Sequence, residues 1–331
     1  MPSTSSNQNK SLTFGDVTAG IAAWAKREPL GALLALGIVA TLVYFYGVAG
    51  LFLEGRRSVA HWAWDAWDPD MNQEHSKLVV PVMLWLVWYH RDKLKASVGK
   101  GSALGLVFVI AGVLLFLLSV RMVEARYALL SVPCLIYGTV RFLWGAAAAR
   151  VLLFPCAFFL FTIPMGAIEQ ATGKLQFVIT GTVGWLSNLI GVKIAAIGTS
   201  LTAADGTFNF EIAEGCSGVR SLIAMAMLTS VYVHLTQREL WKKIVIFAAS
   251  SVFAVIGNVG RIFTVILFAR FINKELAAGL YHDYSGFVFF PFALAAMVGF
   301  SRLLNPHQRT TAPGAPNVQK TQKTDSVTYD Y

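Results

Sequence analysis

The 331-residue chain is poor in charge: only 14% of its residues are charged, whereas 56% are hydrophobic. Soluble globular domains carry about 25% charged residues, so this composition excludes an ordinary soluble protein. The chain is also poor in cysteine, with three at scattered positions. This odd number provides neither a disulfide framework nor the spacing of a cysteine metal site. Cys134 and Cys156 lie inside apolar segments, where we expect them to be packing residues.

The sequence also lacks metal-binding patterns. None of the six histidines belongs to an H-E-x-x-H motif or to another ligand pattern, so we expect no metal and no cofactor. Acidic residues are fewer than basic ones, 18 against 27, which gives a formal net charge of +9. In a protein with many membrane spans, basic residues mark cytoplasmic loops, so we do not expect nucleic acid to be a partner.

Long apolar runs dominate the chain. They recur near or above the spanning length of about 20 residues, and they are too long and too many for buried core helices. The sequence therefore predicts an all-α polytopic membrane protein with about eight transmembrane helices. The predicted spans cover approximately residues 30–53, 78–89, 103–120, 127–140, 151–163, 217–235, 244–268 and 286–304.

The two ends of the chain are polar. Residues 1–28 are rich in Ser, Thr and Asn, and their charges are not followed by the pattern of a signal peptide, so we expect a cytoplasmic tail. Residues 305–331 have too few apolar side chains to form a core, and we expect a disordered cytoplasmic tail. Between them, residues 29–304 are predicted to form a single transmembrane domain.

Residues 174–199 are apolar but interrupted by polar residues and four glycines. If they crossed the membrane, the basic loop over residues 237–243 would lie outside, against the positive-inside rule. We therefore interpret this segment as interfacial or re-entrant. Asp205-Gly206 follows, between alternating apolar residues, and predicts a small β-hairpin on the outer side.

Cys216 occupies a distinctive position within residues 211–222, Glu-Ile-Ala-Glu-Gly-Cys-Ser-Gly-Val-Arg-Ser-Leu. It lies at the start of a long apolar run, and the N-terminus of a helix favours the thiolate, the nucleophilic form of a cysteine. Gly215 and Gly218 allow the backbone of another chain to approach closely. The alternative is that Cys216 is a small packing residue at a helix end.

Arg261 interrupts an apolar stretch, and a guanidinium in a membrane helix is costly enough to imply a partner or a function. About 17 residues separate it from Ile244, or roughly 26 Å of helix, which puts it near the outer leaflet. Asn258 lies three residues earlier on the same helical face, where it can hold the guanidinium or a substrate carbonyl. The alternative is an arginine that extends to the outer headgroups.

His282 also precedes a span on the outer side, within Tyr-His-Asp-Tyr-Ser-Gly. By itself it is typical of an interfacial histidine. However, three separate segments bring a thiol, a guanidinium and an imidazole to one side of the membrane. These are the groups that a cysteine acyl-transfer site requires.

The chain resembles the exosortase/archaeosortase family of polytopic membrane cysteine transpeptidases over about residues 43–304. The likeness includes a region around Asn72 and His75 that is similar to the first outer loop of the family. The matching motifs are Cys216-Ser-Gly218 with Arg220-Ser-Leu222, Asn258-Val-Gly-Arg261-Ile262, and His282 with Gly286.

The resemblance implies a proteolytic sorting reaction at the outer face of the bacterial inner membrane, with residues 29–304 as the catalytic domain. The partners would be membrane lipids, secreted proteins that end in a short motif, a transmembrane helix and a basic tail, and an amine or hydroxyl acceptor. Cys216 would be the nucleophile, Arg261 would stabilise the oxyanion or the thiolate, and His282 would transfer protons. The supporting residues would be Glu214, Ser217, Gly218, Ser221 and Asn258.

Two other hypotheses remain open from the residues. A membrane cysteine protease that only hydrolyses has the same motifs. A transporter or lipid-binding protein would use Arg261 to bind an anionic substrate, with Cys216 merely packed. Transporters commonly have paired broken helices in two related halves, and the sequence shows no such repeat.

The charge pattern makes a topology prediction. A reporter enzyme that works only outside the cytoplasm is expected to be active when fused after Asp205, because one predicted span, 217–235, separates this position from the cytoplasmic basic loop 237–243. Paired alkaline phosphatase and fluorescent-protein fusions check this. Fluorescence in the cytoplasm from the fusion at Asp205 would contradict the predicted orientation.

Overall fold

The computed structural model describes residues 29–52, 57–68, 73–164, 166–211, 218–277, 279 and 282–305, with residues 15, 19, 22, 23, 26 and 27. Most of the first predicted tail and nearly all of the second lie outside these residues. The chain divides into two compact units, Met1–Met165 and Gly166–Tyr331. Each unit is described by itself, and the single catalytic domain over residues 29–304 stays a prediction.

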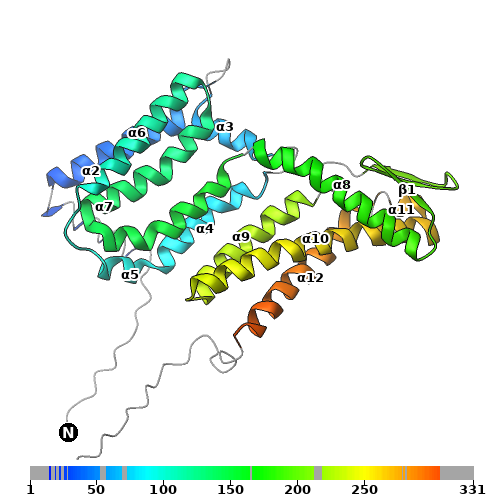
Figure 1. The fold of residues 1–331 in the computed structure, drawn as a ribbon. Helices are drawn as coiled ribbons and strands as arrows, with labels where there is room; N and C mark the ends of the chain where they lie inside the picture. Colours follow the sequence, from blue (N-terminus) through cyan, green and yellow to red (C-terminus); the bar gives the residue numbers. More distant parts are fainter. Residues whose placement is uncertain are drawn as a thin grey trace, which may run out of the picture. The chain divides into compact units, whose positions relative to one another are not determined.

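The first unit is helical (Figure 1). Ser58 caps one of its helices by accepting a hydrogen bond from the backbone N–H of His61. The elements are α2 (Pro29–Leu42), the π-helical η1 (Val43–Val48), α3 (Val59–Ala66), α4 (Ser76–Tyr89), α5 (Arg91–Ala96), α6 (Leu104–Met122), α7 (Ala125–Phe158) and the 3₁₀-helical η3 (Phe159–Thr162).

Glycines bring α6 and α7 close together. A Cβ added to Gly105 would lie 2.3 Å from the backbone nitrogen of Phe142, and one added to Gly138 would lie 2.7 Å from that of Val109. Small residues at such contacts let two helix backbones pack tightly, as is common in membranes. The pair is therefore a closely packed hairpin.

Gly145 divides α7 into two arms. Its φ of 86° and ψ of 178° are not helical. Ile136 and Val140 from the first arm share an apolar cluster with Ala148 and Leu152 from the second, so the arms pack against each other. The arms correspond to the predicted spans 127–140 and 151–163.

The tryptophan-rich loop over residues 54–75 is partly helical, as α3. Trp67 is held in the first unit, because its indole N–H donates a hydrogen bond of 2.8 Å to the carbonyl of Thr162. Trp64 is 62% exposed, and its ring lies under the ammonium group of Lys77.

The second unit combines helices with a small sheet. The three strands are antiparallel in the order β1-β2-β3, and Ser200 pairs with Glu211 across the last two. The elements are α8 (Gly166–Leu189), β1 (Ile194–Ile197), β2 (Ser200–Ala203), β3 (Asn209–Glu211), α9 (Val219–Thr236), α10 (Leu240–Phe271), α11 (Lys274–Leu276) and α12 (His282–Leu303).

The predicted hairpin forms as β2 and β3, with Gly206 at a φ of 72° in the turn between them. The sequence did not predict β1. This strand lies within the segment 174–199 that we interpreted as interfacial or re-entrant, and α8, which begins at Gly166, extends into that segment as far as Leu189. Asn188 at the end of α8 holds β1 through hydrogen bonds of 2.8 and 3.0 Å to the backbone of Ile194. The side-chain amide of Asn188 thus bonds both the N–H and the carbonyl of Ile194, as a neighbouring strand would.

Five helical segments in the described part of the chain are long and apolar enough to cross a membrane: Leu104–Met122, Ala125–Thr162, Val219–Thr236, Leu240–Phe271 and Tyr284–Leu303. They cover six of the predicted spans, because the second includes both arms of α7. The first two predicted spans correspond to shorter apolar helices, Val39–Val48 and Ser76–Tyr89. The fold is a multispanning helical protein, and the count of eight spans is not confirmed.

Gly145→Ala is expected to destabilise the chain by about 1–3 kcal/mol through its backbone conformation alone, since this region is nearly restricted to glycine. The added Cβ would also lie 2.4 Å from the carbonyl oxygen of Lys100. Thermal unfolding in detergent measures the loss. Gly37→Ala is the control, because Gly37 lies in helix α2 with open space around it. Equal midpoints for the two variants would contradict the prediction.

Candidate functional site

Three long helices of the second unit, α9, α10 and α12, lie side by side (Figure 1). Both neighbours run antiparallel to α10. Met297, near the end of α12, clusters with Val233 near the end of α9 and Ile246 near the start of α10. The first turns of α9 and α12 therefore meet α10 at one level, around residues 257–261.

Arg261 on α10 contacts α12 at this level. Its Nε–H donates a hydrogen bond of 3.1 Å to the hydroxyl of Ser285, which is only 4% exposed. The contact gives the partly buried guanidinium a polar neighbour from another helix, as a charge in an apolar span requires. The predicted site arginine thus faces the start of α12.

Asn258 contacts the start of α9. Gly218, the N-cap residue of α9, has a φ of 81°, and a Cβ added there would lie 2.6 Å from Nδ2 of Asn258. Only glycine suits both this backbone conformation and this close approach. The buried Asn258 amide therefore lies directly against the N-terminus of α9.

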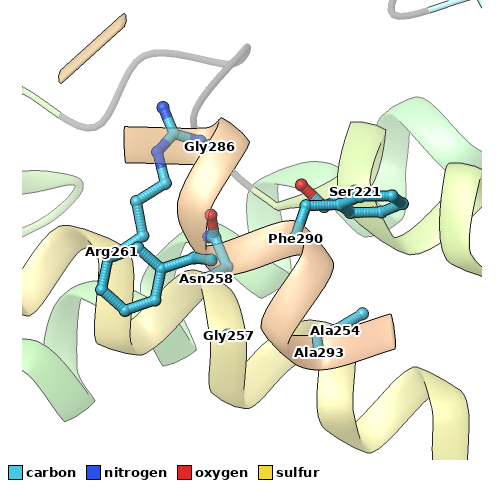
Figure 2. Close-up of a pocket in the computed structure, with 9 residues that line it drawn as sticks. Ser221, Ala254, Gly257, Asn258, Arg261, Gly286, Phe290 and Ala293 are labelled. Atoms are coloured by element: carbon cyan, nitrogen blue, oxygen red, sulfur yellow. The ribbon is translucent and has the colours of Figure 1, made fainter. Parts of the chain in front are cut away.

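These residues border a pocket of about 260 Å³ including its open mouth. Figure 2 shows the polar ends of Ser221, Asn258 and Arg261 on the side where Gly286 lies, and Ala254 and Ala293 at the opposite end. The pocket is thus polar on the side of Gly286 and apolar at the end formed by Ala254 and Ala293. The lining is Ser221, Ala254, Gly257, Asn258, Arg261, Gly286, Phe289, Phe290 and Ala293.

The structure brings together four of the predicted site residues: Gly218, Ser221, Asn258 and Arg261. It does not describe the other four fully. Glu214, Cys216 and Ser217 lie outside the described residues, and His282 is described only as the first residue of α12.

Chain connectivity nevertheless relates Cys216 and His282 to the pocket. Cys216 precedes Gly218 by two residues, and an extended chain covers at most about 3.6 Å per residue. His282 precedes Ser285 by three residues in one helix, so both positions belong to the same helical face.

Ser285 was missed at the sequence level. It belongs to the same Tyr-His-Asp-Tyr-Ser-Gly stretch as His282, and its spacing of three from the histidine was the available signal. A serine near a helix start is so common that the spacing alone does not indicate a contact with an arginine on another helix.

The sheet and α8 pack on α10 just beyond Arg261. Ile262 and Ile266 of α10 share an apolar cluster with Ile179 of α8 and Leu201 of β2. Strand β3 of this sheet ends at Glu211, from which the chain continues toward Cys216. The sheet therefore fixes one end of the segment that contains the cysteine, and Gly218 fixes the other.

The turn of the hairpin is tied to α10 by an ion pair of 2.6 Å between Asp205 and Arg270. Hydrogen bonds from the hydroxyl and backbone N–H of Thr207, followed by the nearby Arg270, hold the pKa of Asp205 below its ordinary value. The carboxylate is therefore charged throughout the neutral and mildly acidic range, and the ion pair weakens only when the pH falls through the lowered pKa.

Within the described residues, no three His, Cys, Asp or Glu side chains gather in a way that could hold a metal ion. The chemistry available at the described site is that of a guanidinium, an amide and two hydroxyls. Such groups bind and stabilise negative charge on oxygen or sulfur.

Gly218→Ala is expected to lower the stability of the chain by about 1–3 kcal/mol more than Gly191→Ala does. Both glycines have a similar positive φ, but Gly191 has open space around it, whereas Gly218 contacts Asn258. Thermal unfolding of the purified variants measures the difference. Because the clash is with Asn258, adding Asn258→Ala to Gly218→Ala should remove much of it. Strictly additive effects would contradict the contact.

Comparison with known families shows one match. A family model described as "Transmembrane exosortase (Exosortase_EpsH)" matches residues 64–299 of the chain. The matched region includes all the pocket residues and the positions of Cys216 and His282. No curated protein and no solved structure shows significant similarity to the chain.

Proposed function

Because the chain belongs to the transmembrane exosortase family, we propose that it is a cysteine protease and transpeptidase that cleaves C-terminal sorting signals of secreted proteins. Its multi-pass membrane architecture agrees with that of the family. The observation that carries the proposal is that two residues of α10 contact the starts of two other helices. Asn258 lies against the start of α9, which follows Cys216 in the chain, and Arg261 bonds the first turn of α12, which begins with His282.

The charge distribution supports an outer-side site in the bacterial inner membrane. From Leu240 to Arg261 the helix α10 advances 21 residues, or about 31 Å, close to the thickness of the hydrocarbon layer. Basic side chains gather near the opposite end of α9, α10 and α12, where positive charge favours the cytoplasm. They are Arg238, Lys242, Lys243 and Arg302.

In the first step, the thiolate of Cys216 attacks the scissile carbonyl carbon, and a C–S bond forms. The carbonyl oxygen becomes an oxyanion, which Arg261 stabilises with its positive charge. The C–N bond then breaks, and His282 gives a proton to the leaving amine. The products are a thioester on Cys216 and the released C-terminal segment.

In the second step, an acceptor attacks the thioester. His282 takes the proton of the acceptor, the new bond to the carbonyl carbon forms, and the C–S bond breaks to regenerate the thiolate. An amine or hydroxyl acceptor gives transpeptidation or ester formation, and water gives proteolysis. The described residues supply charge and hydrogen bonds for both steps.

The proposed substrates are secreted proteins that end in a short motif, one transmembrane helix and a basic tail. Their helix would enter the bilayer beside the enzyme, so membrane lipids are the shared environment of both proteins.

The test uses a secreted protein of the same genome with such a C-terminus, tagged on both sides of its helix and co-expressed with the full chain. Cys216→Ala is expected to abolish removal of the C-terminal tag, because no thioester can form. Arg261→Ala should lower the rate by about two to three orders of magnitude, and His282→Ala should also lower it.

Matched controls are Cys156→Ala and Arg302→Ala. Cys156 is buried in the first unit, and Arg302 lies in the last turn of α12, far along the helix from Ser285. Both should process the substrate at nearly the rate of the unchanged chain. Processing by Cys216→Ala at the unchanged rate would refute the proposal, and the mass of the product distinguishes hydrolysis from transfer.

A further inference from the structure

Ser285 of α12 accepts a hydrogen bond from the guanidinium of Arg261. We propose that Ser285 is a positioning residue for the reaction: it accepts the Nε–H of Arg261 and so fixes the orientation of the guanidinium toward the reacting atoms. The inference rests on the proposed function. It assigns a role to a side chain other than the three proposed catalytic residues, Cys216, Arg261 and His282.

The geometry of the guanidinium gives this contact its effect. The group is planar, with one N–H on Nε and four on the two terminal nitrogens. Fixing the Nε–H at 3.1 Å from the hydroxyl of Ser285 limits rotation of the plane about the side chain. The directions of the terminal N–H groups are then set as well, and donors whose directions are set before the reaction stabilise an oxyanion most effectively.

Ser285 is suited to this role by burial and by charge. It is only 4% exposed and belongs to the same α12 turn as Gly286 of the pocket lining, so its hydroxyl is held by a packed helix. Figure 2 shows the Arg261 side chain extending from α10 toward the end of α12 at which Gly286 lies. An uncharged hydroxyl orients the guanidinium without neutralising it, whereas a carboxylate in the same place would reduce the positive charge.

The contact also relates Arg261 to His282. Both His282 and Ser285 belong to α12, three residues apart, and Ser285 touches Arg261 on α10. This hydrogen bond therefore links the first turn of α12, which begins with the histidine, to the arginine on α10.

The experiment compares Ser285→Ala with Ser285→Thr in the full chain, purified in detergent and supplied with the tagged substrate. Ser285→Ala is expected to lower kcat on the order of tenfold with little change in KM, a smaller loss than removal of the arginine itself. Ser285→Thr keeps the hydroxyl and should retain most of the rate. Ser250→Ala is the control, because this buried serine of α10 bonds only its own helix, at the carbonyl of Phe247.

A double-mutant cycle separates positioning from simple packing. Lysine in place of Arg261 lacks the planar fork and the Nε–H, so in the Arg261→Lys chain Ser285→Ala should cost much less than it does beside arginine. If the Ser285→Ala protein does not accumulate in the cell, kcat is compared between Ser285→Val and Ser285→Thr. Valine and threonine have similar shapes, and only threonine has a hydroxyl.

The possible outcomes are distinct. An unchanged kcat in Ser285→Ala, or equal losses beside arginine and lysine, would overturn the positioning role while Cys216→Ala still abolishes processing. Processing by Cys216→Ala would instead overturn the proposed function. The inference is supported if Ser285→Ala lowers kcat, Ser285→Thr keeps most of it, and the loss in Ser285→Ala is much smaller in the Arg261→Lys chain.

Discussion

A guanidinium inside an apolar helix is the constraint on which the second unit depends. Arg261 lies in α10, and transferring such a charge into hydrocarbon without partners costs several kcal/mol. The protein meets this requirement from α12, whose Ser285 accepts a hydrogen bond from Nε. Because α9 and α12 both run antiparallel to α10, their first turns arrive at the same level. The residues of the candidate site thereby gather at one end of the three helices.

Much of this arrangement could be predicted from the sequence, because it follows from strong local signals. A lone arginine in an apolar run identifies a site, and a spacing of three assigns Asn258 to the same helical face. The hairpin at Asp205-Gly206 and the final three spans likewise follow from turn residues and hydropathy. These features depend on neighbours along the chain, where sequence patterns are informative.

The features that could not be predicted depend on contacts between distant segments. Nothing near Ser285 reveals an arginine on another helix, and β1 forms by pairing with β2 while Asn188 bonds its backbone. The approach of Gly218 to Asn258 joins positions 40 residues apart. Residues 212–217 lie outside the described part of the chain, so the place of Cys216 in the site stays a prediction.

The length of α10 has a further consequence. The helix has 32 residues and extends for about 48 Å, whereas the hydrocarbon layer is about 30 Å thick. Arg261 divides it into a part equal to the membrane and a remainder on which the sheet packs. Under the proposed function, the part of α10 up to Arg261 has the length of a membrane-spanning substrate helix. A substrate helix that begins at its basic cytoplasmic tail and crosses the bilayer would therefore end at the level of Arg261. The bilayer itself would then select the bond to be cut, by its distance from the basic tail.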